Sequence, residues 1–260
     1  DQRDLHSFPT RRSSDLAEHV VQALQSHIFI DAVNTPFQLP EHLAELYRPW
    51  MDLASNMGTF LAHTVSERFN DITIEYKGDI FTTFEPIKAL ILFSIFKNRF
   101  ADILTYINLD ETIIHEGIKV NVIKEEKKVF QNLEARIRIT LKGENDFQSR
   151  IVGTVFSGNP KFIEINQHFM DISPTNFMLL LKSLDKPGVI GRVGTFLGTK
   201  NINIASWQTG RNAPGSMALS VITLDSAVPA EVLDELRKVT DIVEARSEER
   251  RVGKECRSRW

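Results

Sequence analysis

The sequence is poor in several features that would point to particular functions. It contains one cysteine, Cys256, close to its C-terminal end. A single thiol cannot build an intramolecular disulfide framework or a cysteine metal site. The longest nearly apolar run, Ala89 to Phe96, is far shorter than the ~20 residues that a membrane helix needs. We therefore expect neither a disulfide-stabilised secreted domain nor a membrane protein, and the composition is compatible with a reducing cytoplasm.

The two ends of the chain are related to each other as nucleic acid rather than as protein. Residues 4–16 and residues 246–258 can be encoded by opposite strands of one oligonucleotide, which resembles a sequencing adapter. We therefore expect residues 1–16 and 246–260 to be artefact tails that do not pack. The alternative, a genuine basic tail for nucleic acid, is disfavoured by this complementarity.

What remains after the ends are set aside is acidic. The ends carry nine of the 31 Lys and Arg residues and six of the 34 Asp and Glu residues. The remaining core has a net charge of about −6, which argues against a nucleic-acid partner. It also lacks cysteine, and its histidines are scattered without the i,i+4 spacing of a helical metal site. We expect no metal site and no thiolate nucleophile.

The segment around residue 185 predicts a strand, a sharp turn and a helix. The apolar run Phe177–Leu184 is stopped by Asp185-Lys-Pro-Gly188, and apolar residues then recur at helical spacing from Val189. Glycines at 188, 191 and 194 suggest a dinucleotide loop. Their GxxGxxG spacing lacks the two glycines separated by one residue that pyrophosphate binding requires. We expect no NAD site here.

The same segment suits a free amino acid. A helix that begins after Pro187-Gly188 presents backbone N–H groups and a positive dipole end to a carboxylate. Asp185 can hold an ammonium group, although a lone turn aspartate is usually just solvated. Asn203, in a predicted strand from Ile202 to Trp207, can donate and accept at the same ligand if that strand lies beside the first.

The pattern Asp185-Lys-Pro-Gly188 followed by Asn201-Ile-Asn203-Ile-Ala resembles the start of an ACT domain, a ferredoxin-like βαββαβ module that binds amino-acid effectors. The likeness extends through residues 216–225 and 228–236, and it is closest to the serine-sensing ACT domain of D-3-phosphoglycerate dehydrogenases. The resemblance implies a homo-oligomer that pairs through its ACT domains. It implies L-serine as ligand, with these effector-binding residues: Ser183, Asp185, Lys186, Pro187, Gly188, Val189, Ile190 and Asn203.

The rest of the core resembles the other C-terminal parts of the longer dehydrogenases. Residues 17–40, with a short helix around Val20, resemble the exit from the catalytic part, and residues 41–174 resemble the intervening, allosteric substrate-binding domain. A long helix from Glu41 to about Val65 opens that domain. We expect an α+β fold in which the ACT domain covers residues 175–245. Further elements are expected as helices at 86–100 and 110–116 and as strands at 72–76, 119–122, 129–141, 150–156 and 162–165.

Two weaker features complete the reading. In the family, basic residues near a segment resembling residues 161–168 form a second anion site, which implies Lys161 and His168 here. Other basic positions of that pattern are Phe169 and Ser173, which puts this site in doubt. The run from Glu125 to Lys128 is predicted to be a solvated, charged hairpin tip.

The resemblance implies a cytoplasmic, NAD-dependent oxidoreductase that oxidises 3-phosphoglycerate to 3-phosphooxypyruvate for L-serine biosynthesis. Its catalytic and NAD-binding residues would precede Ala17, so the chain itself is expected to hold no catalytic residue and no cofactor. Two alternatives stay open. One is the ACT-containing part of a β-type L-serine dehydratase, and the other is a free-standing amino-acid sensor.

Overall fold

The computed structural model describes residues 41–100, 103–125, 135–211, 213 and 215–249. The expected helix around Val20, the exit segment at residues 17–40 and the two terminal stretches 1–16 and 250–260 lie outside these residues. Within the described part, an α+β arrangement of helices and two separate sheets is confirmed. None of the described helices is long and apolar enough to cross a membrane.

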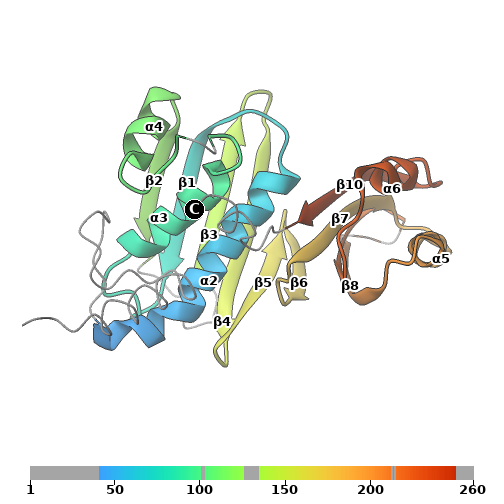
Figure 1. Ribbon diagram of the computed structural model, residues 1–260, viewed down its shortest axis with the longest axis horizontal. Coiled ribbons are helices and arrows are strands. Elements are labelled where there is room, and N and C mark those ends of the chain that lie inside the picture. Colours follow the sequence, from blue (N-terminus) through green and yellow to red (C-terminus); the bar gives the residue numbers. More distant parts are fainter. Residues whose placement is uncertain (1–40, 101–102, 126–134, 212, 214, 250–260) are drawn as a thin grey trace, which may run out of the picture. The chain divides into compact units, whose positions relative to one another are not determined.

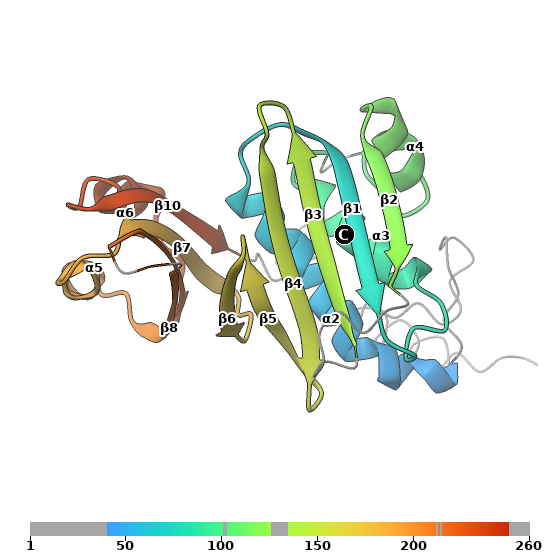
Figure 2. The same cartoon turned by 180° about the vertical axis from the view of Figure 1, so that it is seen from behind.

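The first sheet has six strands in the order β2-β1-β3-β4-β5-β6 (Figures 1 and 2). Neighbouring strands are antiparallel except β1 and β2, which are parallel and are connected through helices α3 (Glu85–Phe96) and α4 (Leu109–His115). The strands are β1 Phe69–Lys77, β2 Lys119–Lys124, β3 Arg136–Gly143, β4 Gln148–Phe156, β5 Asn159–Ile165 and β6 His168–Ile172. The last of these, β6, was not expected from the sequence, and the expected helix 86–100 ends at Phe96.

The described helices of this part of the chain cover one face of the sheet. Helix α2, Glu41–Thr64, lies with α3 on that face, and Figure 2 shows the other face turned away from them. A side chain added at Gly153 of β4 would lie 2.8 Å from both Leu53 and Met57 of α2. A Cβ at Gly58 would lie 2.6 Å from the carbonyl oxygen of Ile91 in α3. The two glycines thus permit the close approach of helix to strand and of helix to helix.

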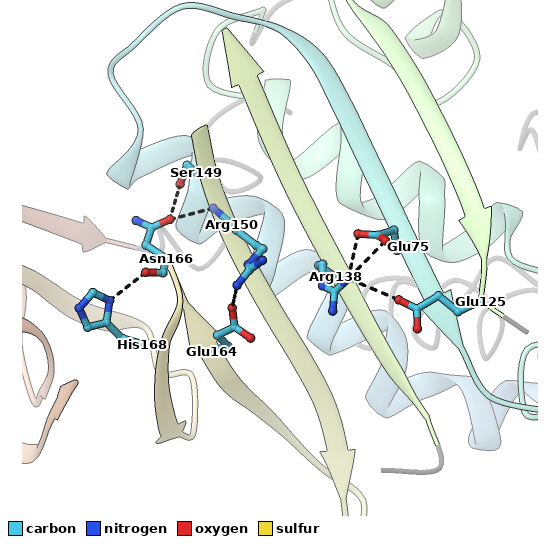
Figure 3. A network of polar contacts seen from close by, with 8 residues as sticks. All are labelled: Glu75, Glu125, Arg138, Ser149, Arg150, Glu164, Asn166 and His168. Atoms are coloured by element: carbon cyan, nitrogen blue, oxygen red, sulfur yellow. Dashed lines mark hydrogen bonds and ion pairs between the residues drawn. The ribbon is translucent and has the colours of Figure 1, made fainter. Parts of the chain in front are cut away.

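The face of the six-stranded sheet that no described helix covers carries paired charges (Figure 3). Arg138 lies 3.2 Å from Glu75 and 3.5 Å from Glu125, while Arg136 donates to Glu125 at 2.5 Å. Arg150 pairs with Glu164, which is almost fully buried. The expectation of a solvated tip was wrong for Glu125, whose side chain is 12% exposed. Each of these carboxylates is paired with a guanidinium, which is the condition for burying such charge.

The second sheet has four strands in the order β10-β7-β9-β8, and all neighbouring pairs are antiparallel. The elements are β7 Phe177–Leu184, α5 Val189–Thr199, β8 Ile204–Arg211, β9 Met217–Leu224, α6 Ala230–Leu236 and β10 Ile242–Glu249. This is the expected βαββαβ module. Its core lies between the sheet and both helices, where Leu179 and Leu181 of β7 meet Val193 of α5 and Leu233 of α6.

Strand β10 is longer than expected. The ACT domain was expected to stop at Ala245, before the supposed tail, yet Arg246 to Glu249 pair with Leu180 to Phe177 of β7. Glu248 is 2% exposed. The expectation that these four residues do not pack was therefore wrong. Strand pairing uses backbone N–H and C=O groups, which every residue other than proline supplies, so it does not depend on the origin of these side chains.

Candidate functional site

The turn between β7 and α5 forms an open helix N-terminus. Gly188 precedes the helix with φ 87°, a left-handed conformation that glycine adopts without steric cost, and no side chain caps the helix. In the described part of the chain, the N–H groups of Ile190 and Gly191 have no hydrogen-bond acceptor. With the helix dipole, these groups form a seat for an anion such as a carboxylate.

Asp185 lies at the start of this turn and is held by three contacts. Its backbone N–H donates to the carbonyl of Ser216 at 2.8 Å. Its Oδ2 accepts from Arg211 Nη1 at 2.8 Å and from the N–H of Gly215 at 3.2 Å. The hydrogen bond from Arg211, followed by that from Gly215, holds the pKa of the Asp185 carboxyl below its usual range. The group is therefore an anion at neutral pH, as the binding of an ammonium group requires.

A second carboxylate, that of Asp241, contacts both the turn and α5. Asp241 accepts from Lys186 Nζ at 2.8 Å and from Arg192 Nη2 at 2.7 Å. The hydrogen bond from Lys186 is the main cause of the lowered pKa of Asp241. Because Lys186 belongs to the turn and Arg192 to α5, this carboxylate ties the turn to the helix. The Lys186 ammonium group is thus already paired with a carboxylate of the same chain.

The other residues expected around the ligand differ in their exposure. Ser183 lies in β7 and is buried, on the same face as the core residue Leu181. Val189 is buried as the first residue of α5. Pro187 is exposed, and Ile190 is 60% exposed beside the free N–H groups. Ile190 is therefore the apolar side chain best placed to contact a ligand from outside.

Asn203 does not join this group within one chain. Its contact with the same ligand required its strand to lie beside β7, and this condition is not met. Strand β9 lies between β7 and β8. Asp185 bonds to Ser216 before β9, whereas the carbonyl of Asn203 accepts from Asp225 after β9, at 3.2 Å. The intervening strand corresponds to roughly 25–30 Å. Helix α5 returns the chain to the far end of the sheet, where the Asn203 side chain donates to Asp225 at 2.6 Å.

The two residues of the implied second anion site are also apart. Lys161, in β5, pairs with Asp171 at 2.8 Å. His168 begins β6 opposite Ile165, and its Nδ1 contacts the carbonyl oxygen of Asn166 at 2.9 Å (Figure 3). Lys161 is four positions from Ile165 along an extended strand, or roughly 13 Å. The two side chains do not converge on one anion.

Three charged residues at the β7–α5 turn were missed from the sequence. Arg211 is 26 positions from Asp185, and Asp241 is 55 positions from Lys186, so no local pattern connects them. Arg192 is close in sequence, but its role depends on Asp241. The described residues contain no group of three or more His, Cys, Asp or Glu side chains that could hold a metal ion.

The fold defines a class of protein in which an α+β domain with a six-stranded sheet is followed by a βαββαβ module. Comparison with known families gives the same division. The family model for the D-3-phosphoglycerate dehydrogenase intervening domain matches residues 46–166, and that for the ACT domain matches residues 177–241. By these two matches the chain resembles the C-terminal part of a D-3-phosphoglycerate dehydrogenase.

Curated relatives carry that name. The chain is 26% identical over 233 residues to D-3-phosphoglycerate dehydrogenase of Synechocystis, covering 89% of the chain and 42% of the relative. It is 29% identical over 229 residues to that of Methanocaldococcus jannaschii, covering 87% and 43%. For Bacillus subtilis the values are 26% over 235 residues, 89% and 44%. The chain thus spans less than half the length of these relatives, whose names favour the dehydrogenase over the dehydratase alternative.

Proposed function

We propose that the ACT domain of this chain binds L-serine as a feedback effector. The observation that carries the proposal is the ionised Asp185 carboxylate beside the uncapped N-terminus of α5. An amino acid carries an ammonium and a carboxylate on one carbon, so the two seats match its two charges. Asp185 receives the ammonium, and the N–H groups of Ile190 and Gly191 receive the carboxylate.

The site is completed by a second copy of the chain. Strand β8 is an edge of the four-stranded sheet, and its one charged residue, Arg211, is the last of the strand. An edge without lysine or proline in its middle is suited to pairing with another strand. In a symmetric antiparallel pair of β8 strands, the start of one strand lies beside the end of the other. Asn203 lies just before the start of β8, and Asp185 contacts Arg211 at its end. The pairing therefore brings the partner's Asn203 toward Asp185.

The proposal extends to the whole protein that contains this chain. That protein oxidises 3-phosphoglycerate to 3-phosphooxypyruvate with NAD, using residues outside this chain, and serine is the distant product of the pathway. L-Serine binds more tightly to the associated state of two ACT domains, and this state restricts movement of the catalytic part. Inhibition follows from that difference in affinity. The second site, at Lys161 and His168, has no part in this proposal.

Calorimetric titration with L-serine tests the site. Asp185→Ala and Asn203→Ala each leave a polar group of the ligand without its partner, so each should weaken binding roughly ten- to a hundredfold. Lys161→Ala removes a charge in the other domain and should leave the affinity unchanged. If neither ACT variant changes the affinity for L-serine, the effector lies elsewhere and the proposal is wrong.

A further inference from the structure

The carboxylate that would receive the effector's ammonium group is already in contact with a cation. Arg211 Nη1 lies 2.8 Å from Asp185 Oδ2, and this same oxygen accepts from the N–H of Gly215. A guanidinium and an ammonium are both cations that donate N–H groups to a carboxylate. Arg211 therefore makes the same kind of contact with Asp185 that a bound amino acid would make.

Of the two partners, Arg211 is the one that can leave. Asp185 is held by its backbone hydrogen bond to Ser216, and its side chain is 23% exposed. The Arg211 side chain is 56% exposed, so it regains water when it turns outward. Exposed ion pairs of this kind are weak, because solvent and salt screen them. The contact can be exchanged for a ligand without disturbing the sheet.

The neighbouring carboxylate offers no such exchange. Asp241 is held by two cations, Lys186 and Arg192, and its side chain is 14% exposed. An incoming ammonium would have to displace both. The two carboxylates at this turn are therefore different in kind: Asp241 is a fixed structural anion, while Asp185 has one exposed and replaceable partner.

We propose that Arg211 is an internal competitor for the effector site, which holds Asp185 in the free protein and lowers the affinity for an amino-acid ammonium group. The inference rests on the proposed function, since it concerns the same site. If Arg211 leaves, its contact with Asp185 is lost when the ligand binds. If it stays, two cations share one carboxylate and repel each other. In both cases removal of Arg211 tightens ligand binding.

The test compares calorimetric titrations of L-serine into the full chain and its variants. Arg211→Ala and Arg211→Gln should each bind L-serine more tightly, by roughly two- to fivefold, which is the range expected for an exposed ion pair. Arg99→Ala is the matched control, because Arg99 is an arginine of similar exposure that pairs with Glu116 at 3.3 Å in the other domain. It also removes one positive charge and should leave the affinity unchanged. Thermal melting checks that each variant is folded.

The outcomes separate this inference from the proposed function. If Asp185→Ala weakens binding and Arg211→Ala tightens it, both are supported. Weaker binding in Arg211→Ala would mean that the guanidinium holds the ligand's carboxylate, and an unchanged affinity would mean that it does not compete. Either result overturns the competitor role while leaving the site in place. If L-serine binds neither the parent chain nor any variant, the proposed function itself fails.

Discussion

The two-copy site can be tested by mixing two variants that each bind L-serine weakly on their own. Within one chain the positions of Asp185 and Asn203 are separated by the length of β9, roughly 25–30 Å, whereas serine itself is shorter than about 6 Å. One serine cannot contact both residues of a single chain. If each site takes Asp185 from one copy and Asn203 from its partner, a pair made of Asp185→Ala and Asn203→Ala chains contains one intact site and one site that lacks both residues.

The expected signal follows from random pairing. When the two variants are refolded together in equal amounts, about half of the pairs are mixed and each mixed pair regains one of its two sites. About one site in four should then bind L-serine with parental affinity, measured as the stoichiometry of a calorimetric titration. A mixture of Asp185→Ala with Lys161→Ala should keep half of its sites whether or not the chains exchange, so it calibrates the stoichiometry of the titration, and co-purification of two differently tagged chains checks the exchange. If exchange is complete and the first mixture regains no site, the two residues do not serve one shared ligand.

Three further predictions concern stability. Gly58→Ala should lower the free energy of unfolding by about 1–3 kcal/mol, because its Cβ meets the α3 backbone at 2.6 Å. Gly194→Ala, whose added Cβ meets open space on α5, should raise the free energy of unfolding by up to about 1 kcal/mol. Denaturant titrations measure both changes, and two changes of the same sign would contradict this packing. Lys186 is the main cause of the lowered pKa of Asp241 in the folded state. The ionised carboxylate therefore stabilises the fold above the unfolded pKa of about 4. This stabilisation is lost as the pH falls through the folded pKa. The melting temperature of the parent chain should therefore decrease more between pH 5 and pH 2 than that of Asp241→Asn, whose substituent tolerates the positive φ at this position. Finally, a chain ending at Ala245 should melt several degrees below one ending at Glu249, because it loses four positions of pairing with β7, and equal melting temperatures would show that these positions contribute nothing.

The succession of helices and strands could be predicted from the sequence. The helix that opens the chain's described part, the strand before Asp185 and the helix after Gly188 all come from local patterns: apolar residues at period 3.6 or in short runs, and Pro-Gly as the breaker between them. The turn that presents free N–H groups is equally local, because four consecutive residues determine it. The resemblance to an ACT domain depended on these same residues.

The strand order, and with it the composition of the site, was decided only by the tertiary structure. Asp185 and Asn203 are separated because β9 inserts between β7 and β8, and no property of either residue's neighbours reveals that insertion. Arg211 reaches Asp185 across 26 positions of sequence, and Asp241 reaches Lys186 across 55. Local patterns report which face of an element is apolar, whereas hydrogen bonds and ion pairs between distant charged side chains form only after the strands have paired. The sequence therefore determined the parts of the proposed effector site, and the pairing of strands decided which of them one chain brings together.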